Sequence, residues 1–304
     1  MDSPIFIGGL ERSGKTYMRM MLSGHPRLFL SRRTNLWTRH FNRYGDLNHA
    51  ENLERCLSVL MKSKHTRSLI VDPSRLKQEL AAGHISYARL FALIHEGHAS
   101  RLGRSRWGDQ TEFLEQYAPV ILSAYPEARF IHMLRDPRDR YEAMLHKSSR
   151  RGGLGVATAH WRSSAELAVK NQSEYSGRYK VIRYEDMARD PGGTLRDVCD
   201  FLEEEYSPVM LRMEGERRFS GSDVGTEELA GPLTAKYIGK YRTGLQRRET
   251  AYIQKNVGDL MGQFGYSLEP IQFSWGESLR FHLLDEAIHS LIRIGWQLRT
   301  GGRA

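Results

Sequence analysis

The sequence predicts an α/β fold in three layers, with a central, mainly parallel sheet between helices. Two observations indicate this class. Short apolar runs alternate with amphipathic stretches along most of the chain, as strands and helices do in doubly wound sheets. The chain also has 304 residues, 40% of them hydrophobic, which is enough to bury a sizeable core between such layers.

The individual elements follow from local patterns. Strands are expected at the short apolar runs Ile5–Gly8, Leu28–Ser31, Arg106–Asp109, Arg129–Leu134 and Lys180–Tyr184, with Ser68–Val71 as a candidate sixth. Helices are expected at the amphipathic stretches Lys15–Ser23, Asn52–Ser63, Ser86–Ser100, Glu112–Ala124, Pro137–Lys147, Val156–Lys170, Thr194–Glu204 and Glu249–Phe264. The Gly- and Ser-rich stretch 217–233 is expected to be a loop.

Residues 1–270 are expected to form one domain and residues 271–304 a C-terminal extension. In that extension an apolar helical stripe contains Leu284, Ala287, Ile288, Leu291 and Leu298. The pattern predicts a helix that packs on the domain, lies on a membrane surface or pairs with another subunit. Its mixed charges argue against lipid.

The bulk composition restricts the partners. A net charge of +9 and a pI of about 9.6 favour a polyanion: nucleic acid, anionic lipid or a multiply phosphorylated cofactor. The two cysteines, Cys56 and Cys199, are too few for a disulfide framework. Because the sequence contains no secretory signal and no long apolar span, we expect a cytoplasmic protein.

The stretch "GLERSGKT", Gly9 to Thr16, predicts a phosphate-binding loop. It matches G-x-x-x-x-G-K-T and stands between an expected strand and an expected helix. Backbone N–H groups and the helix N-terminus would face an anion, with Lys15 as a point charge and Ser13 and Thr16 as hydroxyl donors. The alternative is a tight strand-to-helix turn with a surface lysine.

Such a loop is typical of enzymes that bind a nucleoside triphosphate with Mg²⁺. A P-loop kinase or NTPase would also need a metal-holding aspartate after an apolar strand, and Asp72 in "SLIVDP" has that position. Asp72 is equally well placed to be the N-cap of a helix that begins at Pro73. A basic nucleic-acid-binding protein is a third candidate, although no helix-turn-helix, zinc-finger or ribonucleoprotein signature supports it.

Arg135 predicts a second anion site. It follows the expected strand Arg129–Leu134, and ligands bind at the carboxyl ends of strands in doubly wound sheets. Two anion sites at one sheet edge suit a nucleotide that carries phosphates at both its 5′ and 3′ ends. The alternative is an ion pair between Arg135 and Asp136 or Asp139.

Four segments in this order resemble the PAPS-dependent sulfotransferases, most closely the bacterial ones: "IFIGGLERSGKTYMRMML", "YPEARFIHMLRDPRD", "YKVIRYEDMARDPGGTLRDVCDFL" and "KYIGKYRTGL". The likeness extends from Pro4 to about Tyr266. It implies a P-loop NTPase-like fold and transfer of sulfonate from 3′-phosphoadenosine 5′-phosphosulfate (PAPS) to a hydroxyl or amine of a saccharide, lipid or small alcohol, without a metal. Peptide tyrosine is another open acceptor.

The resemblance also implies roles for individual residues. Arg12, Ser13, Gly14, Lys15 and Thr16 would hold the 5′-phosphosulfate, Arg135 the 3′-phosphate, and Lys240 and Arg242 would lie in a basic loop that closes over the cofactor. Lys15 would neutralise the leaving oxygen. Ala143 stands where relatives have a serine that helps to hold the 3′-phosphate, so that contact is missing or comes from Ser148 or Arg140.

The general base is not fixed by the sequence. Many relatives use a glutamate where this chain has Arg33. In "WGDQTEF", Asp109 and Glu112 are the candidates, and their alternatives are a turn former and a first-turn helix acid. His40, His49 and His160 are weaker candidates for the general base. Acceptor recognition is expected from the loops 32–45 and 146–155, with Trp37, Phe41 or Tyr44 either stacking on the acceptor or lying in the core.

Overall fold

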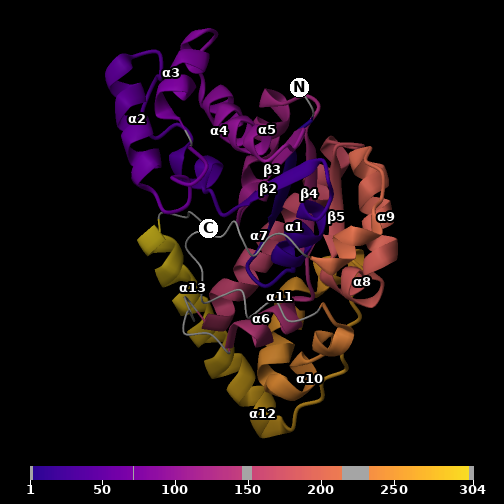
Figure 1. Cartoon of the computed structure of the whole chain (residues 1–304). Coiled ribbons are helices and arrows are strands. Elements are labelled where there is room, and N and C mark those ends of the chain that lie inside the picture. The colour runs from indigo at the N-terminus through magenta and orange to yellow at the C-terminus, as the bar shows by residue number, and fades with distance from the viewer. Residues whose placement is uncertain (1–2, 71, 146–152, 214–232, 301–304) are drawn as a thin grey trace.

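A computed structural model describes residues 3–70, 72–145, 153–213 and 233–300. In these residues five strands form one sheet in the order β2-β3-β1-β4-β5, and every neighbouring pair is parallel (Figure 1). The strands are β1 Ile5–Gly9, β2 Leu28–Arg32, β3 Arg106–Gln110, β4 Arg129–Leu134 and β5 Tyr179–Arg183. The predicted parallel α/β fold is confirmed.

At least one helix follows each strand. Their bounds are α1 Lys15–Ser23, α2 Ala50–Lys62, α3 Pro73–Ala81, α4 Tyr87–Arg101, α5 Ala118–Ala124, α6 Pro137–Leu145, α7 Gly153–Glu174, α8 Tyr184–Arg189, α9 Pro191–Leu202, α10 Tyr241–Gly244, α11 Arg247–Gln263, α12 Trp275–Arg280 and α13 Glu286–Thr300. Short 3₁₀ or π-helical turns are η1 Leu36–His40, η2 Leu114–Tyr117, η3 Pro208–Arg212, η6 Ala235–Tyr237 and η7 Phe281–Asp285.

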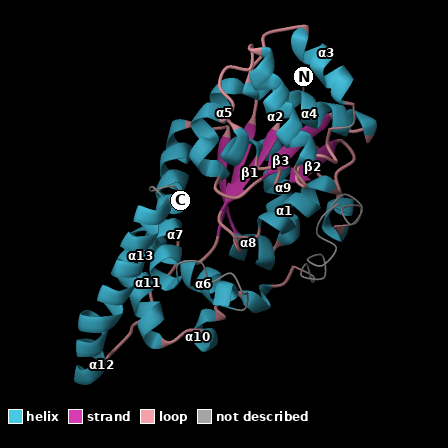
Figure 2. Cartoon of the chain, turned by 90° about the vertical axis from the view of Figure 1, so that its left-hand side faces the viewer, coloured by secondary structure: helices cyan, strands magenta, loops and turns pink. Residues whose placement is uncertain are grey.

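The strand side chains alternate between two cores, one on each face of the sheet. Phe6 joins a cluster with α4 and α5, whereas its neighbours Ile5 and Ile7 join a second cluster with α1, α8 and α9. This two-residue period is the reason why the apolar runs form strands that are buried on both faces. Figure 2 shows helices on both sides of the sheet.

The five expected strands are present, each within one residue of its expected ends. The candidate sixth strand is wrong, because Ser68 and Leu69 lie in a turn between α2 and α3 and Ile70 is irregular; Val71 lies outside the described residues. The expected helix Glu112–Ala124 is divided into the turn η2 and the helix α5, with Phe113 at a positive φ of 60°. Most of the expected loop 217–233 lies outside the described residues.

Strand order positions the site. β1 lies between β3 and β4, and residue Ile7 pairs with Gln110 while Gly9 pairs with Met133. Since parallel strands end at the same edge, the segments after β1, β3 and β4 leave the sheet side by side. These segments contain the P-loop, Glu112 and Arg135.

Candidate functional site

The turn from β1 into α1 has the backbone geometry of an anion cradle. Gly9, Arg12 and Gly14 have φ of 114°, 68° and 93°. A Cβ at Gly9 would lie 2.3 Å from the carbonyl oxygen of Met133, so only glycine fits there. Gly14 is the N-cap of α1 and offers no side-chain cap, so the first-turn N–H groups are open to an anion.

Lys15 lies beneath this loop and is only 5% exposed. Its Nζ donates to the backbone carbonyl oxygens of Gly9, at 2.8 Å, and Leu10. Burial lowers the pKa of Lys15 from 10.5 to about 8, although the carboxylates of Glu112 and Glu115 act in the opposite direction. A buried ammonium whose charge is costly to maintain is well matched to a bound anion.

Glu115 is a supporting residue that the sequence did not single out. It is 1% exposed, and its carboxylate accepts hydrogen bonds from the Gly9 N–H, at 2.7 Å, and from the Ser164 hydroxyl, at 2.7 Å. It therefore fixes the start of the P-loop to η2 and α7. In the sequence it resembles any acid in a helical turn, so no local signal could have identified it.

Arg135 lies in a nearly buried position beside the P-loop. Its guanidinium donates to the carbonyl oxygens of Arg12, at 3.2 Å, and Tyr237, at 3.1 Å, and stacks 4.3 Å from the ring centre of Tyr184. Its Nε is buried and has no hydrogen-bond partner in the part of the chain that the structure describes. Asp136 instead pairs with Arg138 at 2.7 Å, and the structure gives Arg135 no carboxylate among the described residues.

The alternative for Arg135, an ion pair with its acidic neighbours, is therefore wrong. Asp139 instead accepts hydrogen bonds from the N–H groups of Gly239, at 2.6 Å, and Tyr241, at 2.9 Å. Burial raises the pKa of Asp139, and these two N–H groups oppose the shift. The contact holds the segment "KYIGKYRTG" against α6, next to Arg135.

The two cations of this segment differ in position. Lys240 is exposed, and its Nζ lies 5.6 Å from the ring centre of Tyr237, whose carbonyl oxygen binds Arg135. Arg242 is 62% exposed in its side chain and pairs with Glu269 at 2.7 Å. The structure thus brings Lys240 near the Arg135 site, whereas Arg242 is engaged on the surface.

Of the two residues expected to replace the serine contact that Ala143 lacks, Ser148 and Arg140, the structure describes one. Ser148 lies outside the described residues. Arg140 is buried and donates to the carbonyl oxygens of Glu11, at 3.0 Å, and Ala157, at 3.2 Å. Burial lowers the pKa of Arg140 to about 10. Arg140 therefore supports the P-loop backbone from α6.

Asp109 is fully buried inside the fold. Its carboxyl group accepts hydrogen bonds from the hydroxyls of Ser31, at 3.0 Å, Thr34, at 2.7 Å, and Thr111, at 3.4 Å. The Ser31 hydroxyl also contacts His95 Nε2 at 3.0 Å. This environment joins β3 to the segment after β2, and it leaves Asp109 no exposed surface on which an acceptor could lie.

We therefore expect Asp109→Asn to act on stability. An amide nitrogen in place of one oxygen would face hydroxyls that now donate, so the free energy of unfolding should fall by about 1–3 kcal/mol. Urea unfolding measures this. Asp197→Asn is the matched control, because Asp197 is 59% exposed and its pair with Lys180 should contribute less than about 1 kcal/mol. Equal losses in the two variants would contradict the structural role.

Glu112 lies in a more accessible position. Its side chain is 32% exposed and its carboxylate is 3.6 Å from the Arg33 guanidinium. Arg33 reaches it because the Arg33 N–H continues the β2–β3 pairing by donating to the Gln110 carbonyl at 2.7 Å. Glu112 also raises the pKa of Lys15 more than any other charge does, which indicates that the two groups lie close together.

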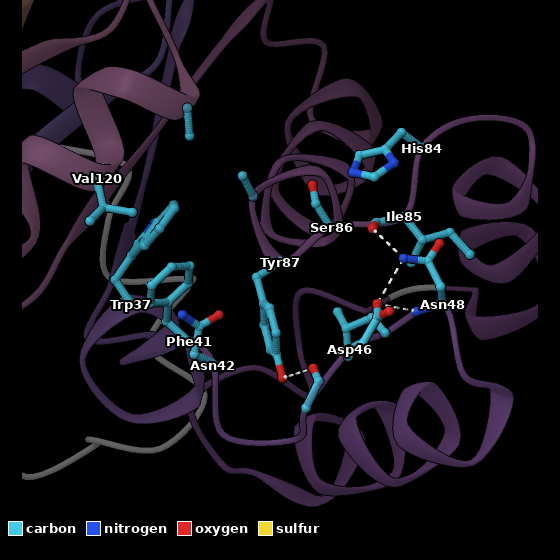
Figure 3. A pocket seen from close by; sticks show the side chains of 14 residues that line it. Trp37, Phe41, Asn42, Asp46, Asn48, His84, Ile85, Ser86, Tyr87 and Val120 are labelled. Carbon is cyan, nitrogen blue, oxygen red and sulfur yellow. Dashed lines mark hydrogen bonds between the residues drawn. The ribbon is translucent and has the colours of Figure 1, made fainter.

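The aromatic residues of the segment after β2 take part in the core. Trp37 is 2% exposed and lies 5.0 Å from Phe41 and 5.3 Å from Phe91, between ring centres. Trp37 and Phe41 also form one wall of a cavity of about 480 Å³ between η1, α4 and α5, opposite Asp46 and Ser86 (Figure 3). Trp37 and Phe41 therefore pack in the core and also line this cavity.

Asp72 is a helix N-cap. Its Oδ1 accepts the N–H groups of Ser74, at 2.9 Å, and Arg75, at 3.1 Å, at the start of α3. Asp72 was the main support for an Mg²⁺-dependent NTPase, and its role as a helix cap accounts for its position without a metal. In the described ranges no group of three or more metal-ligating side chains is found, and no helix there is long and apolar enough to cross a membrane.

Comparison with known proteins decides the family. The family model described as "Sulfotransferase family" matches residues 4–208, about two thirds of the chain. The chain belongs to the sulfotransferase family. This confirms the predicted enzyme class, a PAPS-dependent sulfotransferase.

Two relatives show the breadth of the likeness. The chain is 23% identical to protein-tyrosine sulfotransferase A of Caenorhabditis elegans, over 86% of this chain and 67% of that protein. It is 27% identical to the omega-hydroxy-beta-dihydromenaquinone-9 sulfotransferase Stf3 of Mycobacterium bovis, over 48% of this chain and 38% of that protein. The likeness therefore includes animal as well as bacterial sulfotransferases.

The solved structures confirm the fold. The sulfotransferase domain of the Synechococcus PCC 7002 olefin synthase superposes with a TM-score of 0.64 at 24% identity, covering 88% of this chain and 98% of that domain. The expected P-loop-like α/β sulfotransferase fold is thus present in this chain.

Proposed function

We propose that this sulfotransferase binds PAPS with the 5′-phosphosulfate at Arg12–Thr16 and the 3′-phosphate at Arg135, and transfers the sulfonate to an acceptor hydroxyl. One observation carries the proposal: a buried lysine and a nearly buried arginine follow the adjacent strands β1 and β4, and no carboxylate of the described residues pairs with the arginine. An adenosine with phosphates at both ends would be held at two points at this edge.

Tyrosine side chains lie beside the proposed 3′-phosphate site at Arg135. The ring of Tyr184 stacks on the Arg135 guanidinium. Burial raises the pKa of Tyr17, and Tyr237 acts in the same direction, whereas Arg135 and Arg12 lower this pKa. These influences indicate that Tyr17 lies near Tyr237 and the two arginines. Phenol rings beside guanidinium groups suit a nucleoside that is phosphorylated on either side.

The transfer is an in-line displacement at sulfur. The acceptor oxygen forms a bond to sulfur while the bond between sulfur and the bridging phosphate oxygen breaks, and 3′-phosphoadenosine 5′-phosphate (PAP) leaves. Lys15 and the N–H groups of α1 stabilise the negative charge that grows on the bridging oxygen. Lys15 is suited to this because it is already fixed by two carbonyl oxygens.

Glu112 receives the acceptor proton in this proposal. Its carboxylate is partly exposed, close to Lys15, and paired at 3.6 Å with Arg33. Arg33, which stands where relatives have a glutamate, would orient the Glu112 carboxylate. Asp109 lacks the accessibility that a general base needs.

The acceptor is proposed only as a hydroxyl compound. The animal relative is named for tyrosine and the mycobacterial one for a hydroxylated menaquinone. Similarity to these two proteins therefore does not decide which kind of acceptor this chain uses. Incubation of the protein with PAPS labelled with ³⁵S and fractionated host extract, followed by identification of the labelled product, would define it. Label that appears only as free sulfate would contradict transfer to a hydroxyl acceptor.

Arg135→Met tests the two-point binding of the nucleotide. PAP should bind about 10- to 100-fold more weakly, since one charge-assisted contact contributes about 1.5–3 kcal/mol. Adenosine 5′-phosphate, which lacks the 3′-phosphate, should bind the variant and the parent equally. Calorimetry measures both.

Arg189→Met is the matched control, because Arg189 has a 58% exposed side chain on α8. The parent should also be stabilised more by PAP than by ATP–Mg²⁺ in a thermal-shift assay. Stronger stabilisation by ATP–Mg²⁺ than by PAP would favour a P-loop kinase instead.

A further inference from the structure

The C-terminal segment from Trp275 to Leu298 turns its apolar side outward. Nine large apolar side chains in it are between 43% and 83% exposed: Trp275, Leu279, Leu283, Leu284, Ile288, Leu291, Ile292, Ile294 and Leu298. We call these nine residues the apolar face. Such a concentration within 24 consecutive residues marks an interaction surface rather than scattered exposure.

The polar side of the same segment faces the protein. Asp285 pairs with Arg248 at 2.9 Å, and Glu286 pairs with Lys255 at 2.5 Å, so both acids are held against α11. His289 packs on the ring of Tyr252, 4.9 Å away between ring centres. Figure 2 shows α13 lying along α7 and α11, and the backbone of His289 comes so close that a Cβ at Gly155 of α7 would collide with it.

The predicted helix is therefore present and packs on the domain, but with its apolar stripe turned away from the core. Leu284, Ala287, Ile288, Leu291 and Leu298, the residues of that stripe, are all exposed. A soluble helix that packs in the ordinary way buries such residues. The inversion leaves these residues uncovered by the described part of the chain.

The charges of the C-terminal segment help to identify what covers the apolar face. The acids at 285 and 286 are neutralised by pairs, and residues 287–304 contain three arginines and no aspartate or glutamate. The chain as a whole carries +9. Within Trp275–Leu298 the acids Glu277, Asp285 and Glu286 outnumber the arginines Arg280 and Arg293, but two of the acids are paired with α11 and Glu277 caps α12. From residue 287 onward the charge is only positive, and this weakens the expectation that mixed charges argue against lipid.

The chemistry of the face itself favours lipid over a second copy of the chain. Among the side chains of α13 that the structure describes, the exposed ones are Ala287, Ile288, Leu291, Ile292, Ile294 and Leu298, and none of these can form a hydrogen bond. Protein interfaces carry about one hydrogen bond per 100–200 Å² and favour tyrosine and arginine. Acyl chains need no such partners, and Trp275, 83% exposed, is typical of the headgroup boundary.

We propose that the segment Trp275–Leu298 binds the surface of an anionic membrane, with the apolar face in the boundary between headgroups and acyl chains. The helix lies on the bilayer and does not cross it. The binding does not depend on the proposed catalytic roles, so the two can fail separately.

Vesicle sedimentation tests the proposal. The full chain should pellet with vesicles of phosphatidylcholine and phosphatidylglycerol, pellet less with phosphatidylcholine alone, and be released as salt is raised. The double variant Leu291→Glu/Leu298→Glu, at two of the most exposed positions, should lose at least about tenfold in binding. Val59→Glu/Val169→Glu, at two 41% exposed positions on α2 and α7, should bind as the parent does.

Two results would overturn the proposal. The first is a parent protein that stays in the supernatant with anionic vesicles. The second is a parent that is dimeric by light scattering and becomes monomeric in the Leu291→Glu/Leu298→Glu variant, since a second copy would then cover the face. PAP binding by calorimetry, expected to be unchanged in both variants, shows that they are folded and keeps this test apart from that of the proposed function.

Discussion

Lys15→Met should lower kcat for sulfonate transfer by about 10³-fold or more. The buried ammonium is the cation that lies beneath the P-loop, and removal of one preorganised charge of this kind typically costs 10²–10³, with more expected where the leaving oxygen carries the charge. The loss should appear in kcat as well as in KM for PAPS, because the interaction strengthens as the S–O bond breaks. Single-turnover measurements with ³⁵S-labelled PAPS would show it.

The same variant should fold at least as well as the parent at neutral pH. Burial lowers the pKa of Lys15 to about 8, so below that pH the folded protein maintains a costly charge. Between about pH 8 and 10.5 the unfolded chain holds a proton on Lys15 that the folded chain has lost, and the stability of the parent therefore rises with pH.

Measured against Lys15→Met, the parent should gain roughly 2 kcal/mol in the free energy of unfolding between pH 7 and pH 10. PAP affinity should change in the opposite sense and weaken above about pH 8, since the ligand-free lysine becomes neutral there. A difference between the two proteins that is flat with pH would show that Lys15 is not a buried ammonium. Lys77→Met, on the exposed side of α3, is the control.

Glu112→Gln should lower kcat by about 10²–10⁴-fold and leave PAP binding unchanged. The amide keeps the size of the side chain but does not accept a proton, and general-base catalysis contributes this range. PAP titration by calorimetry shows whether the nucleotide site is intact.

Asp109→Asn distinguishes the two acids of "WGDQTEF". It should affect stability and retain most of the kcat per folded molecule, because the carboxyl group is enclosed by three hydroxyls. If the opposite pattern were found, with Asp109→Asn inactive and Glu112→Gln active, the proposed base would be wrong. Arg33→Met should produce a smaller loss in kcat than Glu112→Gln, since Arg33 only orients the carboxylate.

The sequence by itself determined the fold class, the five strands and the P-loop. Each of these depends on a short pattern: alternation of apolar residues within a strand, glycines where φ is positive, and a lysine at a fixed distance from them. The resemblance of four ordered segments then led to the family, which the family model confirmed. Local patterns of this kind need no knowledge of distant neighbours.

Tertiary structure alone decided which acid is accessible, what supports the P-loop and which way the C-terminal helix faces. Asp109 and Glu112 are three residues apart and similar in sequence, but the pairing of β2 with β3 encloses one and leaves the other beside Arg33. Glu115 reaches Gly9 across 106 residues. The stripe on α13 is apolar in either orientation, and the ion pairs of Asp285 and Glu286 turn it outward. The physical reason is the same in each case: burial and charge pairing are set by residues distant in sequence, and no local pattern contains them.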